Sequence, residues 1–221
     1  MLCFQADVSI PEVPLDGKVV GVDVGLEYFL SASDGWQLER PRFFEGLHRK
    51  LKLLQRRLTK KVKGSEKGKA LQRHIARLHE RIANTRKDFH FKVAHQLCDR
   101  GDVVAVESLN LKGLSCDFLS QQMLDAAHGQ FLNHILPWVC FKRGKGYLKV
   151  EAAGTSQECP SCGGSVKKSL GQRWHDCPHC GASMPRDVAS ALVIQKRAVG
   201  RTVAENAHGD GLAGAVASVA V

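Results

Sequence analysis

Two closely spaced cysteine pairs constrain this chain more than any other feature of its sequence. The motifs Cys-Pro-Ser-Cys-Gly and Cys-Pro-His-Cys-Gly contain Cys159 and Cys162, then Cys177 and Cys180, with fourteen residues between the pairs. Each Cys-x-x-Cys turn places two thiolates on one side of a tight loop, and two facing turns supply the four sulfur ligands that Zn²⁺ prefers. Four cysteine ligands leave no open coordination position, so the sequence predicts a structural zinc ribbon at residues 155–184.

A redox-active Cys-x-x-Cys motif or a pair of disulfides are the other interpretations of these cysteines. A second copy at ribbon spacing favours zinc, because a redox motif does not need one. His175 and His179 flank the second pair, and either ring could replace a cysteine as a ligand. A polar contact with the surface or the backbone is the simpler interpretation of both histidines.

The remaining cysteines are scattered along the chain and follow no disulfide framework, which suits a reducing compartment. They are Cys3, Cys98, Cys116 and Cys140. No leading apolar segment is of signal type, and the apolar run at residues 211–221 is about half the length that a membrane span needs. We therefore expect a cytoplasmic protein with no membrane partner.

The positive charge of the chain is concentrated in one segment. The net charge is +10, yet residues 47–92 contain sixteen Lys or Arg and three acids, a local net charge of +13. Such density suits nucleic acid, because each neutralised phosphate releases counterions; a solvated helix face is the alternative. The candidate contacts are Arg49, Lys52, Arg56, Lys60, Arg73, Arg77 and Arg81.

Apolar patterning predicts a mixed α/β fold. Residues 19–22, 28–32 and 36–44 form an antiparallel meander, with an Asp-Gly hairpin signal before the third strand. The nearly continuous apolar run at residues 102–107 predicts a central strand covered on both faces. Residues 147–151 predict a further strand.

Leucine and isoleucine recur at three- and four-residue steps through residues 45–100, on both sides of a Gly-Ser break. This spacing predicts two basic helices folded back as a hairpin. Residues 117–140 form a helical segment interrupted or ended near Pro137, and residues 186–199 form the last core helix. The Ala- and Gly-rich tail at residues 200–221 has no clear period.

Three acids stand at privileged positions: Asp23 within the first strand, Glu107 at the end of the central strand, and Asp187 at the start of the last helix. Each has a simpler interpretation when taken alone. Asp23 could be a turn residue, Glu107 a solvated strand end, and Asp187 an acid at the positive end of a helix dipole. Together at one sheet edge they would repel one another unless divalent metal neutralised them. Mg²⁺ prefers oxygen ligands, and two ions about 4 Å apart can clamp a phosphodiester for hydrolysis.

In this order, the motifs GVDVG, VVAVESLNLKGL, TSQECPSCG, CPHCG and RDVASA resemble the transposon-encoded TnpB (OrfB) proteins, relatives of the type V CRISPR effector nucleases. The resemblance covers residues 18–199. It implies an RNase H-like, RuvC-type mixed sheet with flanking helices, a basic helical hairpin insertion and a zinc-ribbon insertion. It also implies guide-RNA-directed cutting of DNA, with Asp23, Glu107 and Asp187 as ligands of catalytic Mg²⁺ or Mn²⁺ and the basic helices along the guide–target duplex.

The chain departs from this family at three places. Only 22 residues precede Asp23 where the family has a long N-terminal region, so we expect a truncated member with impaired targeting. Pro185 stands where an acid is common, and Ala189 stands where an Asn is common. A non-catalytic nucleic-acid-binding remnant or regulator of the transposable element is therefore the alternative, and a split protein with a separate N-terminal half is a third.

The resemblance divides the chain into four parts. We expect a remnant of the N-terminal region at residues 1–17, a nuclease core at residues 18–154 and 185–199 that includes the helical hairpin, the ribbon at residues 155–184, and the tail at residues 200–221.

Overall fold

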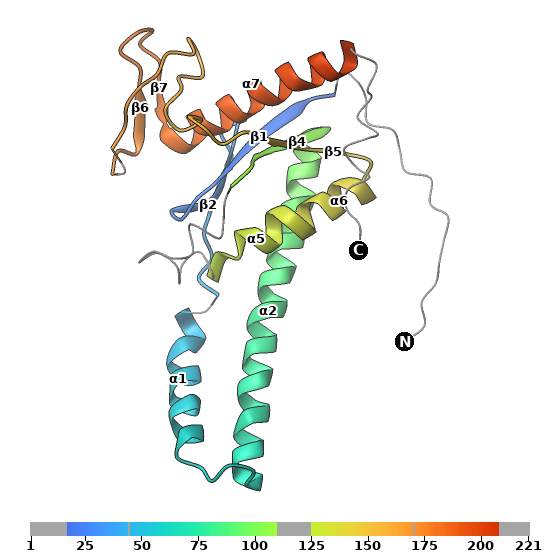
Figure 1. Ribbon diagram of the computed structural model, residues 1–221, viewed down its shortest axis with the longest axis vertical. Coiled ribbons are helices and arrows are strands. Elements are labelled where there is room, and N and C mark those ends of the chain that lie inside the picture. Colours follow the sequence, from blue (N-terminus) through green and yellow to red (C-terminus); the bar gives the residue numbers. More distant parts are fainter. Residues whose placement is uncertain (1–16, 44, 110–124, 170, 208–221) are drawn as a thin grey trace.

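A computed structural model describes residues 17–43, 45–109, 125–169 and 171–207 of the chain (Figure 1). The expected N-terminal remnant at residues 1–17, apart from its last residue, lies outside these ranges. The start of the helical segment expected at residues 117–140 and most of the expected tail also lie outside them.

A five-stranded mixed sheet forms the centre of the fold, with the strand order β3-β2-β1-β4-β5. The first three strands are antiparallel neighbours, whereas β1 pairs in parallel with β4, and β4 in parallel with β5. The strands are β1 (Val19–Val24), β2 (Tyr28–Ala32), β3 (Gln37–Glu39), β4 (Val103–Glu107) and β5 (Gly146–Val150). The meander and the central strand are confirmed, although β3 ends well before residue 44.

Helices cover both faces of this sheet (Figure 1). Helix α7 (Arg186–Ala207) packs on one face, against alternate residues of β1, β4 and β5 such as Val19, Val103 and Leu148. On the other face lie α2 (Glu66–Arg100) and the helical run α5 (His128–Gln130), η1 (Phe131–Ile135) and α6 (Leu136–Lys142). The intervening residues of β4, Val104 and Val106, pack there.

Helix α1 (Glu45–Thr59) packs beside α2, and the pair extends away from the sheet (Figure 1). Leu51, Leu54 and Leu78 are buried between the two helices, as their spacing indicates. The helix boundary follows from Ser65, whose Oγ accepts from the N–H of Gly68 at 3.2 Å and caps α2. Val62 is 79% exposed and lies in the connecting turn instead of the leucine seam.

Two boundaries differ from the sequence prediction. Pro137 neither ends nor interrupts a helix; it lies in the first turn of α6, where its missing N–H is tolerated. The irregularity precedes it as a π-turn, in which the N–H of Leu136 donates to the Phe131 carbonyl. Helix α7 continues through Gly200 to Ala207. Glycine is common just after the end of a helix, but it can also adopt the helical conformation within one. None of the helices in the described ranges is long and apolar enough for a membrane span.

Gly21 allows α7 to approach β1 closely. A Cβ added to Gly21 would lie 2.1 Å from the carbonyl oxygen of Ala191 and 2.6 Å from the backbone nitrogen of Gln195. The Gln195 side chain also donates to the Val19 carbonyl at 2.7 Å. Helix and strand backbones are therefore in direct contact, and this contact depends on the missing side chain.

We predict that Gly21→Ala lowers the free energy of unfolding by at least about 2 kcal/mol, because two backbone segments must separate to admit one methyl group. Chemical denaturation followed by circular dichroism measures the change. Gly200→Ala is the control, since Gly200 lies in α7, the helix that packs on Gly21, but has nothing within 4 Å of its added Cβ. That control should leave stability unchanged or raise it by up to about 1 kcal/mol, and equal losses in both variants would contradict the explanation.

Candidate functional site

The pleat of the sheet directs two of the three predicted acids to the face covered by α7. Side chains alternate along a strand, so Asp23 shares a face with Val19 and Gly21, and Glu107 shares one with Val103 and Ala105. Val19, Val103 and Ala105 pack in the cluster beneath α7. The parallel register pairs Val22 with Val106, which makes Asp23 and Glu107 neighbours at the next position.

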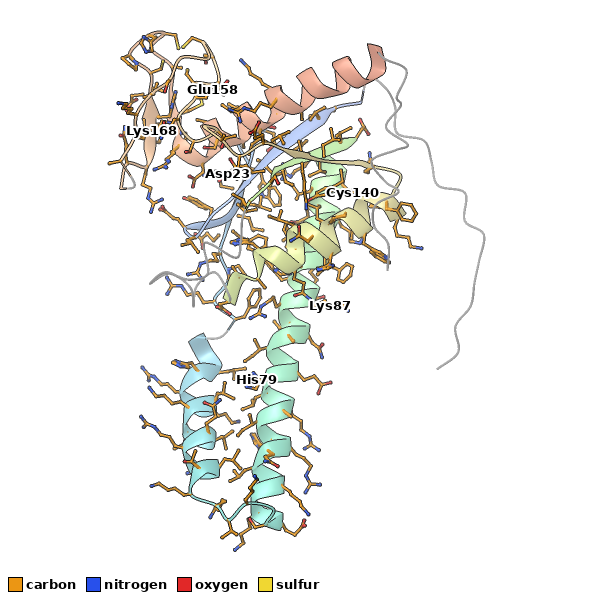
Figure 2. All side chains as sticks on the ribbon, in the orientation of Figure 1. Asp23, His79, Lys87, Cys140, Glu158 and Lys168 are labelled. Carbon is orange, nitrogen blue, oxygen red and sulfur yellow. The ribbon has the colours of Figure 1, made fainter. Side chains whose placement is uncertain are left out.

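Helix α7 brings Asp187 to the same place. Gln195 of α7 contacts Val19 of β1. Ala191, four residues earlier in α7, lies against Gly21, two residues later in β1. Four helical residues rise about 6 Å and two strand residues about 6.6 Å, so the two elements stay in step. One further step places Asp187 over Asp23, and Figure 2 shows Asp23 below the start of α7.

The pKa values of all three carboxyl groups are raised. Burial raises the pKa of Asp23 well above its usual value, and the neighbouring Glu107 and Asp187 raise it further against the opposing effect of Arg186. Burial also raises the pKa of Glu107 and of Asp187. The negative charges are therefore poorly compensated by the protein itself, which is the electrostatic condition in which a divalent cation binds favourably.

Among the described residues, the four cysteines are the one group of His, Cys, Asp or Glu side chains placed to hold a metal ion, with ligand atoms that all lie within 4.8 Å of one another. The three acids do not form such a group in this structure.

Thr155 is a site residue to which the sequence analysis gave no role of its own. Its buried hydroxyl donates to the Glu107 carboxylate and also contacts the Ala152 carbonyl at 3.1 Å. Thr155 opens the cysteine-bearing segment, so this hydrogen bond joins that segment to the acids. The Thr-Ser-Gln motif before the first cysteine was the available signal, but only the tertiary structure pairs Thr155 with Glu107.

A polar hollow of about 1060 Å³ was not predicted from the sequence. Arg173 and Glu27, which form an ion pair at 2.9 Å, line it and also act on the pKa of Asp187. The other lining residues are Leu26, Tyr28, Glu39, Arg40 and Arg42. These arginines lie outside the basic segment at residues 47–92, so charge density along the sequence did not identify them.

The structure brings together the four cysteines that their spacing predicts as ligands, with all four Sγ atoms within 4.8 Å of one another. The Sγ atoms of Cys159 and Cys180 lie 3.6 Å apart, as do those of Cys162 and Cys177. Zinc–sulfur bonds of 2.3 Å require edges of about 3.8 Å, and none of these cysteines is in a disulfide. The residues present therefore fit a structural zinc ion.

Both cysteine turns have the same backbone form. Gly163 and Gly181, each directly after a pair, adopt the left-handed conformation with φ 73°. Their N–H groups donate to the carbonyls of Cys159 and Cys177 at 2.9 and 3.0 Å. Glycine is favoured there because it adopts positive φ without steric strain, so the two motifs build the same turn twice.

His175 is not the surface residue that the sequence suggested. It is fully buried in β6 (Trp174–Asp176), opposite Met184 of β7 (Ser183–Pro185). Its two ring nitrogens lack a hydrogen-bond partner of ordinary geometry. Burial alone would raise the pKa of the Cys159 thiol, but backbone N–H groups and the His175 ring lower it to about 5, which favours the thiolate that metal requires.

The structure places six of the seven predicted nucleic-acid contacts on exposed surfaces of α1 and α2, and the seventh, Lys60, is exposed in the turn directly after α1. At the positions that depart from the family pattern, Pro185 ends β7, and the Ala189 side chain is fully buried. These two positions therefore add no polar group to the acids.

Two family models match the chain. OrfB_IS605, described as a probable transposase, matches residues 2–116, and the Cas12f1-like TNB domain matches residues 128–194. A Cas12f1 chain, solved by cryo-EM in complex with sgRNA and target DNA, superimposes with a TM-score of 0.56 and 18% identity. That match covers 85% of this chain and 51% of the Cas12f1 chain, and the likeness concerns the fold.

Curated relatives agree with these matches. The "Putative RNA-guided DNA endonuclease InsQ" of Escherichia coli (strain K12) is 30% identical over 181 residues, which are 75% of this chain and 44% of InsQ. A "Putative RNA-guided DNA endonuclease" of Streptomyces pristinaespiralis is 29% identical over 157 residues, which are 70% of this chain and 39% of that protein. The chain thus spans less than half the length of either relative.

Replacing Cys177 with serine should remove the bound metal, because a neutral hydroxyl is a poor substitute for a thiolate ligand. We expect one zinc per wild-type chain and less than a tenth of that in Cys177→Ser, measured by plasma mass spectrometry after gel filtration. Cys98→Ala is the control, since Cys98 is buried but lies away from the cluster. Stoichiometric zinc in Cys177→Ser would contradict the four-sulfur site.

Asp23→Asn should stabilise the fold at neutral pH without divalent cations. The pKa of Asp23 in the folded protein lies above its value near 3.8 in the unfolded chain, so folding favours the neutral carboxyl group. The stability that the neutral group contributes is complete below the unfolded pKa and is lost as pH rises through the folded pKa. The advantage of the amide should therefore grow with pH, and added Mg²⁺ should stabilise wild type more than the variant. Thermal denaturation from pH 4 to 8 measures both effects.

Asp102→Asn is the control of opposite sign. Hydrogen bonds from Lys145 and from the backbone of Lys18 lower the pKa of Asp102, so its charged form stabilises the fold above the usual pKa. This variant should lose up to about 1 kcal/mol at neutral pH. A loss of stability in Asp23→Asn as well would refute the view that the three acids repel one another.

Proposed function

Because the chain belongs to the TnpB family of probable transposases (OrfB_IS605), we propose that it is a metal-dependent DNA endonuclease of RuvC type, directed by a guide RNA. The observation that carries the proposal is the juxtaposition of Asp23, Glu107 and Asp187 on one face of the sheet, with all three pKa values raised. The mixed sheet with α7 on this face supports an RNase H-like core. RNA-guided DNA cleavage is what the names of the two relatives describe.

The three acids would hold Mg²⁺ or Mn²⁺. Bound ions of this kind activate a water molecule and stabilise the leaving oxygen of a phosphodiester, so no side chain needs to act as a covalent nucleophile. Thr155 fixes the orientation of Glu107 through its hydrogen bond. Arg186 lies close enough to Asp23 to lower its pKa, which limits the repulsion among the acids before metal binds.

The cysteine-bearing segment would hold structural zinc and position residues around the acids. Arg186 at the start of α7 donates to the carbonyls of Ser169 and Gln172 at 3.0 and 3.3 Å. Arg197 pairs with Glu158 at 2.7 Å and donates to two carbonyls that precede the segment. These hydrogen bonds and the ion pair would hold the cysteine-bearing segment against α7, so that Thr155 and Arg173 stay near the three acids.

Nucleic acid would bind along the helical hairpin and in the polar hollow. Residues 47–92 carry a net charge of +13, and their basic side chains project into solvent from α1 and α2 (Figure 2). This surface suits the phosphates of a guide–target duplex. Arg40, Arg42 and Arg173 of the hollow suit the phosphates of a strand that approaches Asp187.

A non-catalytic nucleic-acid-binding protein is the second candidate function. Pro185 motivates it, because it stands two residues before Asp187 where the family commonly has an acid, and it adds no ligand there. Such a protein would bind DNA in a salt-dependent manner without turnover at any concentration of Mg²⁺ or Mn²⁺.

The deciding experiment is a cleavage assay with the purified chain on labelled single- and double-stranded DNA, with and without co-expressed RNA, in Mg²⁺ or Mn²⁺. We predict cleavage that Asp187→Asn reduces at least about 100-fold, since loss of a metal ligand should exceed the 10- to 100-fold cost of losing its supporting partners. Asp176→Asn is the control, because Asp176 is an exposed acid that contacts Ser183 in the ribbon.

The outcomes separate the two functions. Cleavage that persists in Asp187→Asn would overturn the assignment of the site. DNA binding without cleavage by wild type would favour the non-catalytic protein.

A further inference from the structure

A group of aromatic and basic side chains lies on α2 and α6, on the face of the sheet opposite α7. We call it the aromatic–basic patch, and it consists of the exposed residues Lys87, Trp138, Phe141 and Lys142 and the half-buried Phe91. Trp138 is 47% exposed and Phe141 is 39% exposed. Figure 2 labels Lys87 on α2 and the neighbouring Cys140 on α6, and aromatic rings project from both helices in this region.

Packing between the helices accounts for only part of this arrangement. Trp138 meets Phe91 edge to face, with ring centroids 5.7 Å apart and an interplanar angle of 85°. About half of the Trp138 surface nevertheless remains in contact with water, although burying such a ring would stabilise the fold. The exposed part of the ring is therefore available to a partner.

Two lysines supply positive charge at the rings. The Lys142 Nζ lies 5.8 Å from the Trp138 ring centroid, and the Lys87 Nζ lies 5.9 Å from that of Phe91. Within the described residues, neither lysine forms an ion pair with a carboxylate, and α6 contains no acid. The nearby acids Asp88 and Asp99 are instead paired with Lys92 and Arg143. The patch thus keeps uncompensated positive charge beside open aromatic faces.

This chemistry matches unpaired nucleotides. A base stacks on an aromatic ring whatever its sequence, and adjacent lysines attract the phosphates of the same strand. Bases inside a duplex are already stacked on one another and cannot reach Trp138. An acidic or apolar protein surface would match either the charge or the rings, whereas a single strand of nucleic acid matches both.

The position of the patch separates it from the candidate catalytic edge. Lys145, three residues after Lys142, pairs with Asp102 at 2.7 Å, directly before β4 begins. Glu107 lies at the other end of β4, about 16 Å away along a five-residue strand. Asp187 and α7 are on the opposite face of the sheet. The nucleotides held at the patch are therefore not the nucleotides presented to the acids.

We propose that the aromatic–basic patch binds an unpaired segment of RNA, stacked on Trp138 and held by Lys87 and Lys142. The choice of RNA rests on the proposed RNA-guided function, in which RNA is the strand that is bound and not cut. The proposal assigns the recognition of unpaired nucleotides to this patch, which shares Lys87 with the basic segment at residues 47–92 and adds Trp138 and Lys142 of α6.

Fluorescence anisotropy tests the proposal with the full chain and three probes: a labelled uridine 20-mer RNA, a single-stranded DNA of corresponding length, and a duplex DNA. We expect Trp138→Leu, which keeps an apolar side chain against Phe91, to weaken RNA binding at least five-fold, in line with the measured value of base stacking on one ring. Trp138→Phe should restore most of the affinity. Lys142→Gln should lower the slope of log affinity against log salt by about 0.7.

Lys92→Gln is the matched control for charge, because Lys92 lies on α2, the helix that carries Lys87 and Phe91, but is paired with Asp88 at 2.7 Å. It should change the affinity less than Lys142→Gln does. Affinity for duplex DNA should be the same in wild type and Trp138→Leu. Because the assay measures binding, it can fail while metal-dependent cleavage is present, or succeed while cleavage is absent.

Unchanged RNA affinity in Trp138→Leu would overturn the proposal, as would a loss confined to single-stranded DNA. A change from a self-associated to a monomeric chain in Trp138→Leu, seen by light scattering, would also overturn it and assign the patch to a second copy of the chain. If Trp138→Leu fails to fold, as judged by circular dichroism, Lys142→Gln and Lys87→Gln decide the matter by their effect on RNA affinity.

Discussion

Helix α7 meets β1 where Gly21 has no side chain, so that a Cβ there would lie 2.1 Å from the Ala191 carbonyl oxygen. This contact fixes the helix along the strand, because each turn of α7 then advances in step with two residues of β1. Asp187 consequently lies over Asp23, and the pairing of β1 with β4 adds Glu107. The geometry of the candidate site therefore follows from backbone packing, and a glycine with no chemical role is a precondition for it.

Bringing three acids together opposes folding, since burial raises the pKa of each, and repulsion from Glu107 and Asp187 raises the pKa of Asp23 further. The surrounding structure offsets this only in part: Thr155 donates to Glu107, and Arg186 lies near Asp23. Both residues border the cysteine ribbon, whose four sulfur atoms fit a zinc ion. A structural metal in the ribbon would thus act on the acids indirectly, by holding the groups that orient and partly neutralise them.

The basic residues are distributed among three surfaces with different geometry. The hairpin presents many lysines and arginines with few aromatic rings, which suits the regular phosphates of a duplex. The polar hollow gathers Arg40 and Arg42 from the segment after β3 and Arg173 from the ribbon. The aromatic–basic patch pairs rings with lysines on the opposite face of the sheet. A strand that is cut and a strand that is kept can therefore occupy separate parts of this small fold.

The sequence by itself determined the elements whose signals are local. Cysteine spacing located the ribbon, apolar runs located the strands, and leucine periodicity with Ser65 located the hairpin. It also singled out the three acids, whose catalytic role stays a prediction. Only the tertiary structure paired Thr155 with Glu107, buried His175, carried α7 past Gly200 and exposed Trp138 beside Lys142. The physical reason is that cysteine turns, caps and periodicity act over a few residues, whereas burial and electrostatic pairing depend on segments that meet only after the chain has folded.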